Sequence, residues 1–133
     1  MLEDRLCIAS NGAINVQLSP EDMVQCDIGN AGCNGGLLSQ TIDFLSTEGV
    51  VTEGCKPYTS GVGSNGFCSF GCTDWTVEYK KYYCKPQTLK MPTKVEAIQQ
   101  EIMDNGPIQV GFVIYSDFLV YSSGIYQVVD NTI

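Results

Sequence analysis

The spacing of apolar residues along the chain predicts two amphipathic helices. Over residues 37–47, steps of i, i+3, i+4 and i+7 bring four side chains to one face: Leu38, Thr41, Ile42 and Leu45. Gly49 follows as a residue that can end such a helix. The second helix is predicted to start at Thr93, where Glu96 completes a capping box, and to bury Val95, Ile98, Ile102 and Met103. It should stop at Asn105-Gly106-Pro107.

A third, shorter helix is predicted from the residues at its start. Ser19 is a favourable N-cap, Pro20 suits the first helical position, and acidic residues follow in the first turn. This helix can run only to about Cys26, because residues 27–32 have the composition of a loop.

The last third of the chain has a strand-like pattern. Residues 76–83 are rich in aromatic and β-branched types, and residues 126–129 continue that pattern. Residues 108–114 form a nearly continuous apolar run, which is typical of a strand covered on both faces. Residues 115–121 suit a short helix or turn, whereas residues 54–72 are glycine-rich and irregular. The pattern therefore predicts an α+β fold class.

The charge pattern argues against nucleic acid and membranes as partners. Seven basic and fifteen acidic residues give a formal net charge of −8, which repels phosphate backbones. Lys80, Lys81 and Lys85 lie among tyrosines, but they are too few to form a basic stripe and we expect them to be solvated. No run approaches the roughly 20 apolar residues that span a bilayer.

Seven cysteines and no histidine limit the possible chemistry. No Ser-His or Cys-His nucleophile can be completed within these residues, so we expect no catalytic residue in the chain. The Cys68-x₃-Cys72 spacing without histidine argues against zinc, and we expect neither a metal nor a cofactor. This cysteine content indicates an oxidising compartment. However, the charged residues 1–5 are not followed by the apolar segment that a signal peptide would have.

Ordered blocks of sequence resemble the papain family of cysteine peptidases. In chain order they are Ser19-Pro20-Glu21-Asp22 with Cys26, Cys33-Asn34-Gly35-Gly36, Gly54-Cys55-Lys56-Pro57-Tyr58, Cys68-x₃-Cys72, Asn105-Gly106-Pro107-Ile108, Tyr115-Ser116-Asp117-Phe118 and Gly124-Ile125-Tyr126. The opening residues 4–8 and the pair Cys68 and Cys72 look most like the cathepsin B branch. The resemblance implies a two-lobe papain-like fold, with residues 1–75 in the helical lobe and residues 76–133 in an incomplete β-barrel lobe.

Two departures from the family pattern shape the expected function. The nucleophile motif C-G-[SA]-C-[WY] is absent, as are the catalytic His and Asn regions. The block order implies that this chain is the segment between them, and that its partners are the N- and C-terminal parts of the same peptidase. Residues 59–67 are short and lack the paired histidines of the cathepsin B occluding loop, which suits an endopeptidase. The alternative is an inactive relative or truncated product that binds peptides or proteins.

The resemblance also implies roles for individual residues. Gly35 and Gly36 would pair their backbone with a peptide or protein substrate in extended conformation. Leu37, Leu38 and Gly111 would form an adjoining apolar pocket. Alternatively, Leu38 belongs to the buried face of its helix. The family's bridges would be Cys26–Cys68 and Cys55–Cys72. Cys7 and Cys33 would pair outside this chain, whereas Cys84 has no assigned partner. A lysosome-like vesicle or the cell exterior is the expected location.

Overall fold

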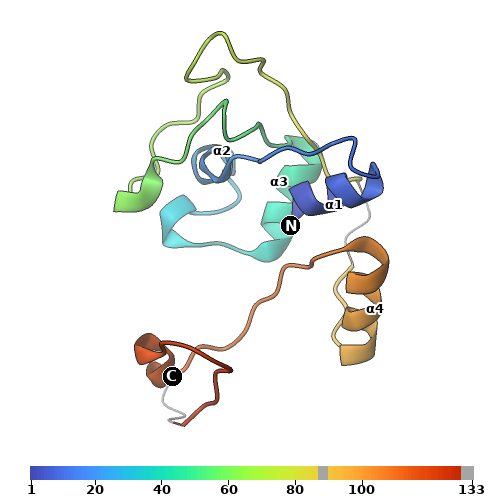
Figure 1. Ribbon diagram of the computed structural model, residues 1–133. Coiled ribbons are helices and arrows are strands. Elements are labelled where there is room, and N and C mark those ends of the chain that lie inside the picture. Colours follow the sequence, from blue (N-terminus) through green and yellow to red (C-terminus); the bar gives the residue numbers. More distant parts are fainter. Residues whose placement is uncertain (87–89, 130–133) are drawn as a thin grey trace.

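Helices joined by long irregular segments make up the described residues, 1–86 and 90–129, of this computed structural model (Figure 1). The elements in chain order are α1 (Leu2–Ala9), α2 (Pro20–Cys26), η1 (Gly32–Asn34), α3 (Leu38–Thr47), η2 (Ser60–Val62), α4 (Val95–Asn105) and η3 (Ser116–Val120), where η denotes a 3₁₀ helix. α1, α2 and α3 lie together with the loops that connect them, while η3 lies apart from them near the C-terminus. None of the described helices is long and apolar enough to cross a membrane.

The short helix α2 forms as its first residues predict. The Ser19 hydroxyl oxygen accepts the N–H of Asp22 at 3.1 Å, and Pro20 occupies the first helical turn. The same hydroxyl donates to the carbonyl of Lys56 at 2.6 Å. The cap therefore also ties α2 to the segment that follows α3, because one buried hydroxyl serves both contacts.

The predicted helix over residues 37–47 is confirmed as α3, which starts one residue later. Gly49 ends the turn after it with a φ of +68°, a conformation that glycine adopts without strain. The apolar face of α3 is buried only toward its C-terminal end, where Phe44 and Leu45 join Val50 in a small core. Partly buried side chains pack around that core: Leu2, Leu18, Met23, Cys26, Ile42 and Cys84.

The second predicted helix also forms, as α4, but two details of its prediction are wrong. Lys94 is its N-cap and no side chain caps it, so the capping box at Thr93 is absent. Its apolar stripe is not buried either, since no residue of α4 is buried. Polar contacts of one side chain tie α4 to α1. Arg5 donates to the carbonyl of Pro107 at 2.8 Å and pairs with Glu101 at 3.1 Å. α1 itself was not predicted, since its hydrophobic pattern is weak and its N-cap, Met1, offers no capping side chain.

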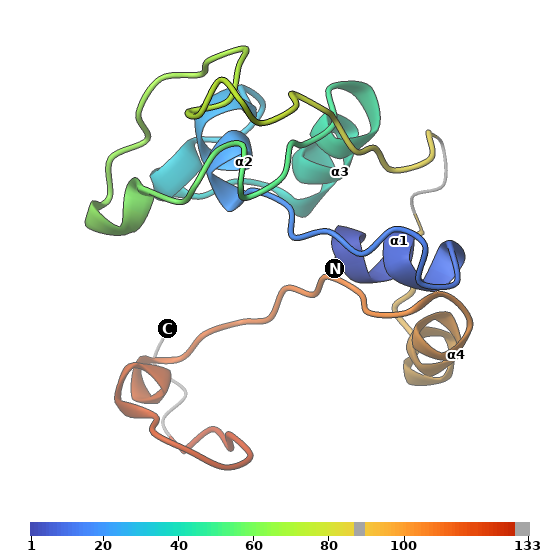
Figure 2. The ribbon, with the colours of Figure 1, turned by 45° about the horizontal axis from the view of Figure 1, so that its top comes forward.

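The strands predicted for residues 76–83, 108–114 and 126–129 are absent from the structure. Within residues 1–86 and 90–129, β-pairing is limited to two isolated bridges, Leu18 with Thr52 and Val50 with Tyr82. Residues 108–114 are extended and exposed, with Phe112 63% exposed, and run as a single stretch between α4 and η3 (Figure 2). A strand needs a neighbouring strand to pair its backbone, so an apolar run alone does not suffice. Of the short helix or turn predicted within residues 115–121, the structure has the short helix, η3.

Two disulfides staple the glycine-rich loop, and both match the predicted pairs. Cys26 at the end of α2 bonds to Cys68, and Cys55 bonds to Cys72. The remaining cysteines, Cys7, Cys33 and Cys84, carry free thiols. The loop thus has covalent anchors where it has little apolar surface to bury.

A thiol count tests this pairing directly. We expect three reactive thiols per chain when the protein is denatured in guanidinium without reductant and treated with Ellman's reagent, since four of the seven cysteines are bridged. A count of seven would contradict both bridges. A count of one would require a further bridge among Cys7, Cys33 and Cys84.

Candidate functional site

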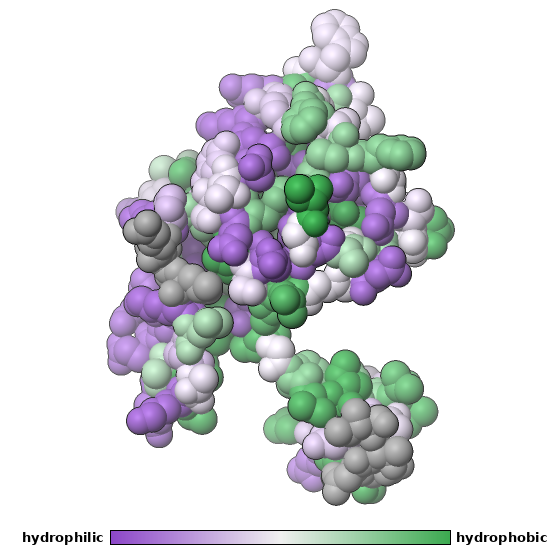
Figure 3. All heavy atoms as spheres, turned by 180° about the vertical axis from the view of Figure 1, so that it is seen from behind, coloured by the Kyte–Doolittle hydropathy of each residue, from purple (hydrophilic) through white to green (hydrophobic). Residues whose placement is uncertain are grey.

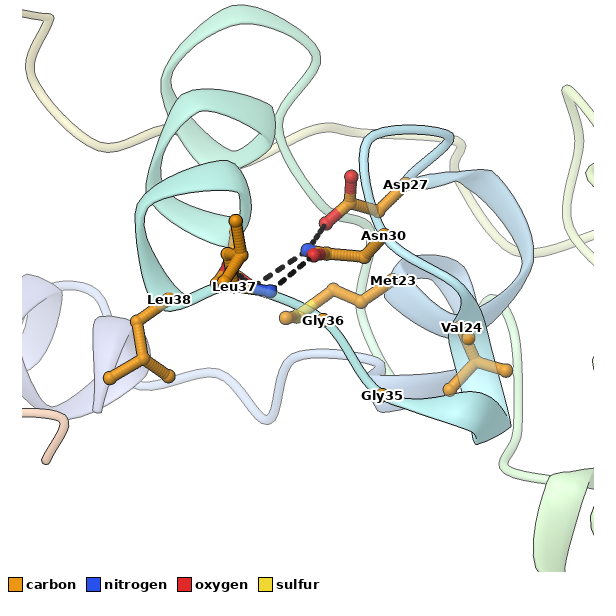
Figure 4. A pocket seen from close by; sticks show the side chains of 10 residues that line it. Met23, Val24, Asp27, Asn30, Gly35, Gly36, Leu37 and Leu38 are labelled. Carbon is orange, nitrogen blue, oxygen red and sulfur yellow. Dashed lines mark hydrogen bonds between the residues drawn. The ribbon is translucent and has the colours of Figure 1, made fainter. Parts of the chain in front are cut away.

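The glycine pair after Cys33 lines a pocket between α2 and α3 (Figure 4). The cavity measures about 260 Å³, and four of the five predicted site residues border it: Gly35, Gly36, Leu37 and Leu38. The other lining residues come from α2, the turn after it and the first turns of η1 and α3: Met23, Val24, Asp27, Asn30, Gly32 and Thr41. Leu37 is 65% exposed, so its side chain is available to a ligand rather than committed to the core.

The backbone of the two glycines differs in its hydrogen bonds. Gly35 has a φ of +96°, and it bonds internally through its N–H to Gly32 at 3.1 Å and through its carbonyl to Ala31 at 2.8 Å. Among the described residues, neither the N–H nor the carbonyl of Gly36 has a hydrogen-bond partner. Gly36 is exposed as well. It therefore presents one free donor and one free acceptor at the rim of the pocket.

Asn30 links the pocket wall to α3 and was not singled out from the sequence. Its amide oxygen accepts the N–H of Leu37 at 2.7 Å, and its amide nitrogen donates to Asp27 at 2.7 Å and to Thr41 at 3.1 Å. The sequence carries only a weak indication of this role, namely that Asn30 follows Asp27 by three residues in a turn. Its partners at positions 37 and 41 cannot be read from the neighbouring sequence.

Gly111, the fifth predicted site residue, does not border this pocket. It lines a larger cavity of about 710 Å³ between α1, α3 and α4, which it shares with Leu38. A Cβ added at Gly111 would lie 3.8 Å from Leu38 Cδ1, so the two residues are neighbours in the wall of that cavity. The Leu38 side chain points away from Asn30, and Leu38 lines both cavities.

A free thiol also lines the larger cavity. Cys84 is half-buried there, and burial raises the pKa of its thiol, with Arg5 opposing the rise only in part. A thiol in this state is mostly protonated near neutral pH and is a weak nucleophile. Cys84 therefore does not have the environment of an activated cysteine.

A buried ionic cluster holds α2 in place behind the pocket. Asp22 is fully buried and accepts from Lys56 Nζ at 2.7 Å, from Lys81 Nζ at 3.0 Å and from the N–H of Val51 at 3.1 Å. Burial alone would raise the pKa of Asp22, but the two lysines and the Val51 N–H outweigh it and hold that pKa below its usual value. Asp22 therefore fixes the helix that supplies one pocket wall.

The described part of the chain brings no group of three Cys, Asp or Glu side chains together in a way that could hold a metal ion. The carboxylates near the pocket instead bond to protein donors. Asp27, for example, accepts from the N–H of Gly29 at 3.1 Å as well as from Asn30. The pocket thus offers exposed backbone and apolar side chains, which suit a peptide better than a small polar ion.

Comparison with known proteins places this arrangement in a family. Residues 1–132 match the family described as papain family cysteine protease. The chain belongs to this family. Among papain-family relatives, it is 36% identical over 125 residues to Cathepsin B-like CP3 of Giardia intestinalis, covering 93% of this chain and 42% of that protein. It is 36% identical over 135 residues to Cathepsin B of Dictyostelium discoideum, covering 92% of this chain and 43% of that protein.

The fold of the papain-family chain is also matched in three dimensions. The structure of proCathepsin B S9 from Trypanosoma congolense superposes with a TM-score of 0.78 and 25% sequence identity, covering 98% of this chain and 45% of that one. The papain-like fold and the cathepsin B-like resemblance are thereby confirmed. The chain spans less than half the length of these relatives.

Proposed function

We propose that this chain forms part of the substrate groove of a cathepsin B-like cysteine endopeptidase. The observation that carries the proposal is the free backbone N–H and carbonyl of Gly36 at the rim of the pocket between α2 and α3. An extended peptide can pair with both groups as an added strand does, donating one hydrogen bond and accepting the other. Gly36 is exposed, so a peptide backbone can reach both groups.

The side chains around Gly36 would select an apolar substrate residue. Leu37 is exposed beside the glycine and has no polar group to satisfy, so it favours an apolar side chain. The thiolate and imidazole that attack the peptide carbonyl would come from polypeptide outside these 133 residues, since the chain contains no histidine. The residues described here would bind the substrate and orient it for that attack.

Two further surfaces are suited to contact with another polypeptide. The cavity of about 710 Å³ has apolar residues of α1, α3 and α4 in its wall, together with charged side chains such as Arg5, Lys90 and Glu101. Apolar side chains also gather on the C-terminal part of the molecule, which lies apart from the helices (Figure 3). We propose that the rest of the same peptidase covers both surfaces. The two disulfides are consistent with an oxidising location, and we propose a lysosome-like vesicle or the cell exterior.

Titration with a blocked peptide tests the groove. We expect acetyl-Phe-Leu-Ala-amide to shift the amide resonance of Gly36 in the 133-residue chain and to leave that of Gly61, which does not line the pocket, in place. Gly36→Ala should weaken binding about tenfold, the effect of losing roughly 1.4 kcal/mol, because its Cβ would lie 2.0 Å from Asn30 Oδ1 and displace the backbone that carries both groups. Gly61→Ala is the matched control, because a Cβ there meets nothing closer than 3.9 Å. Binding without a shift at Gly36 would contradict the proposal.

Activity assays test the assignment of the chemistry to other polypeptide. The chain alone should not hydrolyse a fluorogenic dipeptide amide, and an epoxide directed at papain-like nucleophiles should label none of its thiols. Labelling of Cys7, Cys33 or Cys84 would overturn this part of the proposal. Peptide binding by an assembled protein that never hydrolyses the peptide would instead favour an inactive, peptide-binding relative.

A further inference from the structure

We infer that Asn30 is a positioning residue for the peptide-binding edge: its side-chain amide fixes the backbone of Gly36 and Leu37 so that the free groups of Gly36 face the pocket rim. This inference rests on the proposed function of Gly36. Asn30 itself need not touch the peptide, because it acts through the backbone that it holds. Figure 4 shows the amide between Asp27 on one side and the backbone of residue 37 on the other.

The first argument is that Asn30 caps a helix to which it does not belong. α3 starts after Leu37, whose apolar side chain cannot cap the helix. Asn30 lies seven residues earlier, yet it accepts the N–H of Leu37 and donates to Thr41 in the first turn of α3. An amide that bonds both groups fixes where α3 begins, and therefore fixes the direction in which the chain enters it.

The second argument is that the orientation of the amide is determined chemically. Asp27 is only 7% exposed, and a carboxylate can only accept hydrogen bonds. The amide nitrogen of Asn30 must therefore face Asp27, at 2.7 Å, which turns the amide oxygen toward the N–H of Leu37. Asp27 is held in turn by the N–H of Gly29 at 3.1 Å. The contacts thus run from the end of α2 through Asn30 to the start of α3.

The third argument is steric and explains the glycine at position 36. A Cβ added to Gly36 would lie 2.0 Å from the amide oxygen of Asn30 and 2.3 Å from its Cγ, so the two residues could not keep their places. A Cβ added to Gly35 would meet nothing within 4 Å. The Asn30 side chain therefore occupies the space that a side chain at position 36 would need, and only glycine leaves the two residues in contact.

This arrangement lowers the cost of binding an extended peptide. A loop that already holds its bound conformation does not lose conformational freedom when the ligand arrives. Without the Asn30 contacts, the backbone at Gly36 would have to be ordered by the peptide itself. We therefore expect Asn30→Ala to weaken binding of acetyl-Phe-Leu-Ala-amide about tenfold, which corresponds to about 1.4 kcal/mol.

The test compares Asn30→Ala with Asn15→Ala, an exposed asparagine outside the pocket. Peptide affinity is measured by titration, and hydrogen exchange is measured at the Leu37 amide. Asn30→Ala should weaken affinity and accelerate Leu37 exchange about tenfold, whereas Asn15→Ala should change neither. Unchanged Leu37 exchange in Asn30→Ala would overturn the positioning role. No shift at Gly36 in the unsubstituted chain would overturn the proposed function instead, so the two failures are distinguishable.

A second variant separates positioning from general stability through its pH profile. Asn30→Asp places a carboxyl beside Asp27, the one titratable residue among those that bond to Asn30. Ionised, the new carboxyl repels Asp27; protonated, it can again donate to Asp27 and accept from Leu37, as the amide did. Peptide affinity of Asn30→Asp should therefore rise as the pH falls from 7 to 5, relative to the unsubstituted chain. A flat relative profile would overturn the inference even if Asn30→Ala fails to fold.

Discussion

Replacing Asp22 with alanine should lower the free energy of unfolding by about 3–5 kcal/mol, the usual cost of leaving a buried charge without its partner. Lys56 is only 3% exposed and its ammonium group is 2.7 Å from Asp22 Oδ1. Without that carboxylate, the buried ammonium keeps the carbonyl of Ser69, at 2.5 Å, as an uncharged acceptor. Lys81, at 3.0 Å from the other oxygen, loses its ionic partner as well. Urea denaturation followed by circular dichroism measures the change.

Asp43→Ala is the matched control for this variant. Asp43 lies on the exposed face of α3, where its backbone carbonyl rather than its carboxylate accepts hydrogen bonds from Ser46 and Thr47. Its loss should change the free energy of unfolding by no more than about 0.5 kcal/mol, as for other surface substitutions. Equal effects of Asp22→Ala and Asp43→Ala would show that the buried cluster does not stabilise the fold.

The same cluster gives the fold an expected dependence on pH. The pKa of Asp22 in the folded chain lies below the usual aspartate value of 3.8. At low pH the folded chain therefore binds fewer protons than the unfolded chain does. Its stabilisation is therefore fully present above that value and is lost as the pH falls through the folded pKa. The unsubstituted chain should lose stability below about pH 4 more steeply than Asp22→Ala does. Parallel pH profiles of the two proteins would contradict this linkage.

Removing the Cys26–Cys68 bridge with Cys26→Ser and Cys68→Ser should lower the free energy of unfolding by about 4 kcal/mol. In the loop-entropy account, the bridge restricts the unfolded chain over its 42-residue separation. Cys55→Ser with Cys72→Ser removes a bridge of separation 17 and should cost less, about 3 kcal/mol. Denaturant unfolding under non-reducing conditions measures both losses.

Cys33→Ser is the control for the disulfide variants, because Cys33 is exposed and carries a free thiol. It should leave the unfolding midpoint within the error of the measurement. A paired variant as stable as Cys33→Ser would show that its bridge does not form in solution. A larger loss from the shorter bridge would contradict the loop-entropy account and indicate that native packing around Cys55, which is fully buried, determines the effect.

Features set by neighbouring residues were predictable from the sequence. Ser19 caps α2, Pro20 starts it and Gly49 closes the turn after α3, because each effect depends on a few adjacent residues. The disulfide pairs also matched, but through the family resemblance, since spacing alone leaves several pairings open.

Features that depend on distant contacts were not predictable in this way. The run at 108–114 has the composition of a strand, but pairing requires a neighbour that its own residues do not specify. Asn30 acts on Leu37 and Thr41 across an intervening turn, which no local pattern encodes. The glycine pair was found through the family motif, whereas the side chain that fixes it became visible only in the folded contacts.

The two disulfides interlace, and this has a consequence for the integrity of the chain. Cys55 lies between Cys26 and Cys68, and Cys68 lies between Cys55 and Cys72, so every peptide bond from residue 56 to residue 67 is enclosed by both bridges. Most of this segment is exposed, and such glycine-rich loops are the usual places for a chain to be nicked. A single cut there would leave two pieces joined by both cystines, so the wall that carries Gly36 would stay attached to the rest of the molecule.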